Sequence, residues 1–186
     1  MVTTRISKAL LLPAVLIMLS PIAALAATRS TAPNEGDMAA SFNVGFARAF
    51  DNHFEEIDPV FTGTFEYYTS PRVSWRGLLG VTSFDADRPR NANIDVTFLT
   101  ANVLYNWEGG QVHPYVTGGI GLYGKDASSA LPSDFDETVF GLNGGGGIDW
   151  FLGERWALEF EGTVHSLTGE DPDTALLGTV GIKFWF

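Results

Sequence analysis

The sequence contains no cysteine among its 186 residues, which excludes disulfide bridges, cysteine-ligated metal centres and a cysteine nucleophile. Basic side chains are scarce, since 11 Lys and Arg stand against 22 Asp and Glu and leave a formal charge of −11. Binding to nucleic acid depends on clustered Lys and Arg, so this balance excludes a nucleic-acid partner. Charged residues make up only 18% of the chain, below the roughly 25% of ordinary soluble domains. The chain therefore has the length of one domain without the surface composition of a typical soluble one.

No segment after the first 27 residues offers an apolar run long enough for a membrane-spanning helix. Near the N-terminus, Arg5 and Lys8 precede an apolar run at 9–19 and a stretch of small residues, which is the layout of a secretory signal peptide. We expect cleavage after Ala26 or Ala27. A membrane anchor is the alternative, but this run is shorter than the about 20 apolar residues that a spanning helix needs. The predicted organisation is a signal peptide at 1–27, a short periplasmic segment at 28–38 and one barrel domain at 39–186.

From residue 39 onward, apolar residues alternate with small or polar ones, and stretches rich in Asp, Asn, Pro and Gly interrupt the alternation. This period of two predicts β-strands and an all-β fold. The predicted strands lie at 39–50, 59–68, 73–84, 95–107, 114–125, 138–151, 156–165 and 176–186. An even number of strands fits a closed barrel, so we predict an eight-stranded antiparallel up-and-down transmembrane β-barrel.

The connections between the predicted strands alternate in length, which separates two ends of one cylinder. Three connections are short, at 69–72, 108–113 and 152–155. Four are long and acidic, at 51–58, 85–93, 126–137 and 168–174. Strands in soluble sandwiches follow one another every 8–12 residues, whereas this spacing leaves room for tilted spanning strands of about 9–11 residues. The pattern favours a membrane barrel with acidic outer loops.

Tryptophan lies next to the short connections. Trp75 and Trp156 begin strands there, and Trp107 and Trp150 end them. The alternation turns these four side chains outward, which predicts an aromatic girdle at a membrane interface. The alternative is that the tryptophans only cap a soluble core.

Charged residues within the predicted strands fall on the inward face. Glu66 and Arg76 face each other across the connection at 69–72, and Lys183 lies opposite Glu159 if the last hairpin pairs those two positions. We predict that both pairs are structural ion pairs in the lumen. Glu159 and Glu161 could instead form the acid and base of a glycoside hydrolase. Same-face neighbours in any strand are about 7 Å apart, so their spacing carries little information.

Glycine is concentrated at 118–121 and 144–147. The order Gly119-x-Gly121-x-x-Gly124 matches a dinucleotide-binding fingerprint as a string, but that fingerprint needs a helix after it, and these glycines lie within a predicted strand. We expect the glycines to relieve crowding in a narrow barrel, so that Tyr115 and Tyr123 can fold over them.

The last predicted strand has Ile182, Phe184 and Phe186 on one apolar face. Together with the predicted signal peptide, strands and aromatic rim, this makes the chain resemble the small outer-membrane β-barrel proteins of Gram-negative bacteria, such as OmpA-type transmembrane domains and opacity-type barrels. The resemblance implies an outer-membrane location and an assembly signal at Ile182, Phe184 and Phe186. It further implies that the barrel-assembly machinery and periplasmic chaperones are partners during biogenesis. The folded protein is expected to be a monomer that contacts membrane lipid and lipopolysaccharide.

The leading functional hypothesis is a non-enzymatic barrel with a plugged lumen that serves envelope integrity or surface interaction, without catalytic, cofactor-binding or metal-binding residues. A channel or transporter for small hydrophobic solutes is one alternative, and a soluble lipocalin-like carrier is another. A lipid-modifying enzyme is a third, prompted by His165 and Ser166. Because these two residues are adjacent, alternation sends them to opposite faces, unlike the paired His and Ser of lipid A deacylase barrels.

Overall fold

The structure is a computed structural model that describes residues 33–49, 57–86, 92–107, 110–127, 137–168 and 174–186. Eight β-strands make up nearly all of this part of the chain. They are β1 (Met38–Ala49), β2 (Asp58–Ser70), β3 (Val73–Ala86), β4 (Ala92–Asn106), β5 (Val112–Ala127), β6 (Glu137–Phe151), β7 (Trp156–Leu167) and β8 (Thr174–Trp185). The described residues include no helix that is long and apolar enough to cross a membrane. The predicted signal peptide lies outside the described residues.

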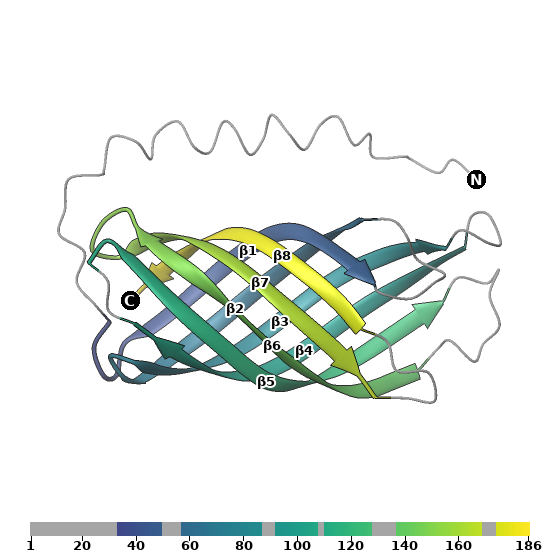
Figure 1. Ribbon diagram of the computed structural model, residues 1–186, viewed down its shortest axis with the longest axis horizontal. Helices are drawn as coiled ribbons and strands as arrows, with labels where there is room; N and C mark the ends of the chain where they lie inside the picture. The colour runs from purple at the N-terminus through teal and green to yellow at the C-terminus, as the bar shows by residue number, and fades with distance from the viewer. Residues whose placement is uncertain (1–32, 50–56, 87–91, 108–109, 128–136, 169–173) are drawn as a thin grey trace.

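Each strand pairs antiparallel with the next, and β8 pairs with β1, so the sheet closes into a barrel (Figure 1). The predicted fold class is therefore confirmed. The strand bounds agree with the predicted ones to within three residues, and the barrel begins at Met38, one residue before the predicted boundary. The three short connections lie at one end of the cylinder, where the C-terminus also lies, and we call this the short-turn end. The opposite end is called the long-connection end.

Side chains alternate between the inside and the outside of the barrel along every strand. In β7, for example, Glu159, Thr163 and His165 are buried, whereas Phe160 and Val164 are exposed. The outer wall is apolar in its middle part, as a surface in contact with lipid should be. Its exposed residues include Phe42, Leu79, Leu99, Ile120, Leu142 and Phe160.

The register of the last hairpin differs from the prediction by two residues. Lys183 pairs with Ala157, and Glu159 pairs with Gly181, so positions 159 and 183 are not directly opposite. A shift of two residues preserves the face of every side chain, because strands alternate with a period of two. Lys183 and Glu159 both still point into the lumen.

Several glycines lie beneath large inward-facing side chains. A β-carbon on Gly147 would lie 2.5 Å from the hydroxyl oxygen of Tyr115, and one on Gly141 would lie 2.7 Å from the ring of Tyr123. Gly121 also lies under Tyr123, at 2.9 Å. Tyr115 and Tyr123 therefore fold over glycines as expected. Gly118 and Gly144 differ, because a β-carbon on either would have no heavy atom within 3.5 Å.

The apolar outer wall predicts that a charge there is costly. Phe160→Arg should lower the free energy of unfolding by about 2–4 kcal/mol, since a cation near the bilayer midplane loses its hydration. Phe160→Leu is the matched control, because it also removes the ring but adds no charge. Urea unfolding in lipid vesicles measures both. Equal stability of the two variants would mean that Phe160 does not face lipid.

The crowding at Gly147 predicts that even one methyl group is not tolerated there. A β-carbon would also lie 2.3 Å from the backbone oxygen of Phe160, so Gly147→Ala must displace backbone as well as Tyr115. We expect a loss of about 1–3 kcal/mol, typical of overpacking. Gly77→Ala is the control, because nothing lies within 4 Å of its β-carbon. The same urea titration compares them, and a Gly147→Ala barrel as stable as the Gly77→Ala barrel would contradict the packing described.

Candidate functional site

Charged side chains gather inside the barrel near the short-turn end. They come from five different strands, and their side chains are no more than 8% exposed. The set comprises Glu66 on β2, Arg76 on β3, Asp149 on β6, Glu159 and Glu161 on β7, and Lys183 on β8. We call these six residues the charged layer.

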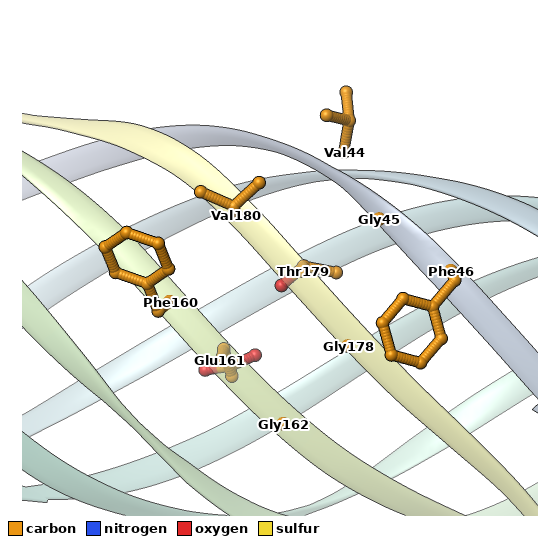
Figure 2. Close-up of a pocket in the computed structure, with 9 residues that line it drawn as sticks. All are labelled: Val44, Gly45, Phe46, Phe160, Glu161, Gly162, Gly178, Thr179 and Val180. Carbon is orange, nitrogen blue, oxygen red and sulfur yellow. The ribbon is translucent and has the colours of Figure 1, made fainter. Parts of the chain in front are cut away.

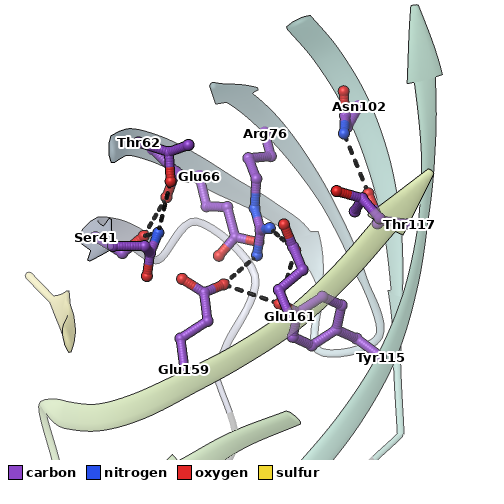
Figure 3. A network of polar contacts seen from close by, with 12 residues as sticks. Ser41, Thr62, Glu66, Arg76, Asn102, Tyr115, Thr117, Glu159 and Glu161 are labelled. Atoms are coloured by element: carbon purple, nitrogen blue, oxygen red, sulfur yellow. Dashed lines mark hydrogen bonds and ion pairs between the residues drawn. The ribbon is translucent and has the colours of Figure 1, made fainter. Parts of the chain in front are cut away.

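Arg76 contacts three of the carboxylates (Figure 3). Its Nη2 lies 3.2 Å from Oε1 of Glu66, the residue directly opposite it on β2, and 2.7 Å from Oε1 of Glu159. Its Nη1 pairs with Oε2 of Glu161. The planar guanidinium suits several carboxylates at once, because its donors point in fixed directions.

Lys183 also contacts three carboxylates. Its Nζ lies 3.0 Å from Oε2 of Glu66, and 2.9 Å from both Oδ2 of Asp149 and Oε1 of Glu159. The sequence predicts two separate pairs, Glu66 with Arg76 and Glu159 with Lys183. The structure brings both pairs together and joins them into one network, because Glu66 and Glu159 each contact both cations. Lys183 reaches Glu159 despite the shifted register, since the residue opposite Glu159 is Gly181, which has no side chain.

Neutral donors also bind carboxylates of the charged layer. The hydroxyl of Tyr115 lies 3.0 Å from Oε1 of Glu159 and 2.8 Å from Oε2 of Glu161, so the two carboxylates share its one proton. Glu66 accepts hydrogen bonds from the hydroxyls of Tyr68 and Ser74, each at 3.3 Å. Such bonds lower the cost of removing carboxylates from water.

Apolar side chains lie on the short-turn side of the charged layer. The rings of Phe151 and Trp185 stack with their centroids 4.7 Å apart, and Tyr68 is 1% exposed beside them. The short-turn apolar layer consists of Ala39, Tyr68, Phe151, Ala157 and Trp185.

A second apolar cluster lies toward the long-connection end, and every one of the eight strands contributes to it. Phe98 stacks on Tyr123 with ring centroids 5.8 Å apart. The apolar ring consists of Ala47, Val60, Leu78, Val96, Phe98, Tyr123, Val139, Leu167 and Leu177. Between this ring and the charged layer lie buried Ser, Thr and Asn side chains, among them Ser41 and Thr64, which share a 2.7 Å hydrogen bond.

His165 and Ser166 are not brought together. The ring of His165 is buried, where its Nδ1 lies 2.8 Å from the hydroxyl of Tyr123 and its Nε2 lies 3.0 Å from that of Thr163. Ser166 is exposed on the outer face. Both nitrogens of the imidazole are engaged within the lumen, so the ring is not placed to activate Ser166.

On the outer wall, residues of β1, β7 and β8 line a shallow hollow of about 550 Å³ (Figure 2). Its floor includes Gly162 and Gly178, which are directly opposite each other, and Phe46 leans over Gly178. Val44, Phe160 and Val180 form the apolar sides. Glu161 and Thr179 also line the hollow, but the ionisable group of Glu161 pairs with Arg76, so the hollow offers little for catalysis.

The remaining predicted residues lie on the outer face. Trp75, Trp107, Trp150 and Trp156 are between 44% and 57% exposed and lie near the short-turn end. Phe186 is 59% exposed. The centroid of its ring lies 6.3 Å from that of Phe65 and 6.1 Å from that of Phe184. The backbone N–H of Phe186 donates to the carbonyl of Met38 at 3.0 Å, which extends the closure between β8 and β1.

The described residues contain no group of three or more His, Cys, Asp or Glu that could hold a metal ion. The pairing of Arg76 with Glu161 and the apolar ring were not among the features predicted from the sequence. Alternation gives the inward position of each residue in the apolar ring, so the residues of the ring could be predicted from the sequence. The choice of partner for Arg76 depends on which strands face each other across the lumen, which alternation does not give.

A family model described as an outer membrane protein beta-barrel domain matches residues 13–184 of this chain. The match spans nearly the whole chain, which is therefore a member of the outer-membrane β-barrel family and is located in the outer membrane. No curated protein sequence matches it.

Several solved structures share the fold. Neisserial surface protein A is 12% identical, with a TM-score of 0.67 over 81% of this chain and 99% of that one. The outer membrane protein OprG of Pseudomonas aeruginosa is 15% identical, with a TM-score of 0.59 over 82% and 97%. Ail, the attachment invasion locus protein of Yersinia pestis, is 12% identical, with a TM-score of 0.57 over 82% and 99%. At these identities, the likeness extends to the fold and not to a shared function.

The charged layer predicts that losing one cation is costly. Arg76→Met removes the cation that pairs with Glu161 and leaves Glu66 and Glu159 with Lys183 alone, and removing one partner of a buried ion pair costs about 3–5 kcal/mol. Urea unfolding measures the loss. Removing one carboxylate as well, in Arg76→Met with Glu161→Gln, should restore part of the stability. Arg155→Met, at an exposed turn position, is the control and should change stability by no more than about 0.5 kcal/mol. Equal effects at Arg76 and Arg155 would contradict the network.

Proposed function

We propose that this protein is a non-enzymatic outer-membrane barrel with a sealed lumen, whose long acidic connections serve envelope integrity or surface interaction. The observation that carries the proposal is the apolar ring, to which all eight strands contribute. An eight-stranded barrel encloses a space that side chains can just fill. The charged layer and the short-turn apolar layer fill the same space at two further levels.

The engagement of the ionisable side chains supports a role without catalysis. Glu159 and Glu161 both contact Arg76, and they share the hydroxyl proton of Tyr115. An acid and base pair needs contact with substrate, and apolar clusters lie toward both ends of the lumen from these carboxylates. A channel for small or hydrophobic solutes would need the apolar ring and the charged layer to open together.

We assign the long-connection end of the barrel to the cell exterior and the N-terminus to the periplasm. The long connections lie mostly outside the described residues, but their sequence is rich in Asp and Glu. We propose that they meet the phosphates of lipopolysaccharide through divalent cations, without an ordered metal site. We further propose that the protein is a monomer and that its apolar outer wall contacts membrane lipid.

The last strand suggests how the protein reaches the membrane. We propose that Ile182, Phe184 and Phe186 are bound by the barrel-assembly machinery after delivery by periplasmic chaperones. Phe186→Ala should then lower the amount of protein recovered in the outer membrane. Phe65→Ala is the matched control, since it removes the other ring of the same contact without changing the C-terminal residue. Equal yields of the two variants would contradict an assembly signal at Phe186.

A sealed lumen predicts the absence of a stable conductance. The purified wild-type protein in planar bilayers should show no steady open level, because ions would have to pass the apolar ring and the charged layer. Lys183→Ala removes three contacts with carboxylates and should permit brief openings. A steady, ion-selective conductance of the wild-type protein would overturn the sealed lumen and favour the transport alternative.

A further inference from the structure

The charged layer holds more negative than positive groups. Arg76 and Lys183 provide two cations, whereas four carboxylates contact them. With all four ionised, two negative charges would have no counter-ion. Such an excess is costly where water is excluded, since neither hydration nor a partner compensates for the charge.

Two carboxylate oxygens in this layer have no hydrogen-bond partner, namely Oδ1 of Asp149 and Oε2 of Glu159. Both oxygens are fully buried, and the two residues lie directly opposite each other on β6 and β7. Side chains at directly opposite positions begin about 5 Å apart, and like charges there repel. Asp149 and Glu159 therefore repel each other when both are ionised, and each also has a carboxylate oxygen that is free to share a proton.

The two residues differ in how well their charge is supported. Oε1 of Glu159 lies 2.7 Å from Arg76, 2.9 Å from Lys183 and 3.0 Å from the hydroxyl of Tyr115. The carboxylate of Asp149 contacts Lys183 at 2.9 Å, and Lys183 is shared with Glu66 and Glu159. Asp149 is therefore the carboxylate whose ionised form gains least from its surroundings.

Other titratable and charged groups surround Asp149 from several strands. His113 lies directly opposite it on β5, and its Nε2 lies 3.0 Å from the carbonyl oxygen of Gly110, so that nitrogen carries a hydrogen. Among the described residues, these groups are Glu66 and Tyr68 on β2, Arg76 on β3, His113 and Tyr115 on β5, Glu159 and Glu161 on β7, and Lys183 on β8.

The narrow lumen limits which positive charge can balance this excess. A metal ion needs several oxygen ligands and room for its remaining water, and the described residues form no such group. A proton needs no space. We propose that the charged layer binds one proton, carried by Oδ1 of Asp149 and shared with Glu159, so that the two residues together hold a single negative charge. The proton lowers the excess of negative charge in the layer from two to one.

This inference rests on the proposed sealed lumen, which keeps hydrated cations from the layer. It implies that folding takes up a proton. In water an aspartate is ionised at neutral pH, so a proton from the solution adds to the carboxylate of Asp149 and forms an O–H bond as the barrel closes.

Infrared spectroscopy of the folded barrel in phosphatidylcholine vesicles at neutral pH tests the proposal. A protonated carboxyl group has a C=O stretch that is separate from the carboxylate and amide bands. We expect one such band in the wild-type protein, a shift of that band when aspartate is isotope-labelled, and its loss in Asp149→Asn. Glu154→Gln, at an exposed turn position, is the control and should keep the band.

The proposal is overturned if the wild-type protein lacks the band, if the band persists in Asp149→Asn, or if it shifts with labelled glutamate instead of labelled aspartate. Should Asp149→Asn fail to fold, the two labelled wild-type spectra still decide. Bilayer recordings on the same preparation separate the two proposals. A conducting barrel with the band overturns the sealed lumen alone, and a non-conducting barrel without the band overturns the bound proton alone.

Discussion

The backbone of a membrane-spanning chain must satisfy its hydrogen bonds without water, and every other feature of this barrel depends on that constraint. The pairing of β8 with β1 removes both sheet edges at once. Closure with eight strands in turn fixes a narrow interior. Inward-facing residues must then share a small space, which explains why Tyr115 and Tyr123 lie over glycines and why the glycines are concentrated on β5 and β6.

The narrow interior also explains why the charged residues form one network. A buried ion pair adds little net stability, but a buried charge without a partner is costly. Glu66 and Glu159 each contact both Arg76 and Lys183, so each charge in the layer depends on the register of several strands. The layer thereby links strands that are not neighbours in the sheet, such as β3 and β7.

Much of this architecture could be predicted from the sequence, because it follows from local periodicity. Alternation identifies the strands and places Glu66, Arg76, Glu159 and Lys183 on the inward face. The cross-strand pairing of Glu66 with Arg76 follows from the short connection between β2 and β3. The register of the last hairpin could not be predicted in the same way, since its connection is long and a shift of two residues preserves every face. The contact of Arg76 with Glu161 depends on the closure of the barrel, which is a property of all eight strands.

The central claim is that the lumen is closed to water-soluble molecules at the level between the apolar ring and the charged layer. The chain has no cysteine, so a single one can be placed there by Thr117→Cys, at a buried inward position of β5. The direct measurement is the rate at which a small, charged thiol reagent modifies this cysteine in the folded barrel, relative to Glu154→Cys in an exposed turn. The account predicts that Cys at position 117 reacts only after unfolding, whereas Cys at position 154 reacts at once. Similar rates at the two positions in the folded barrel would contradict it.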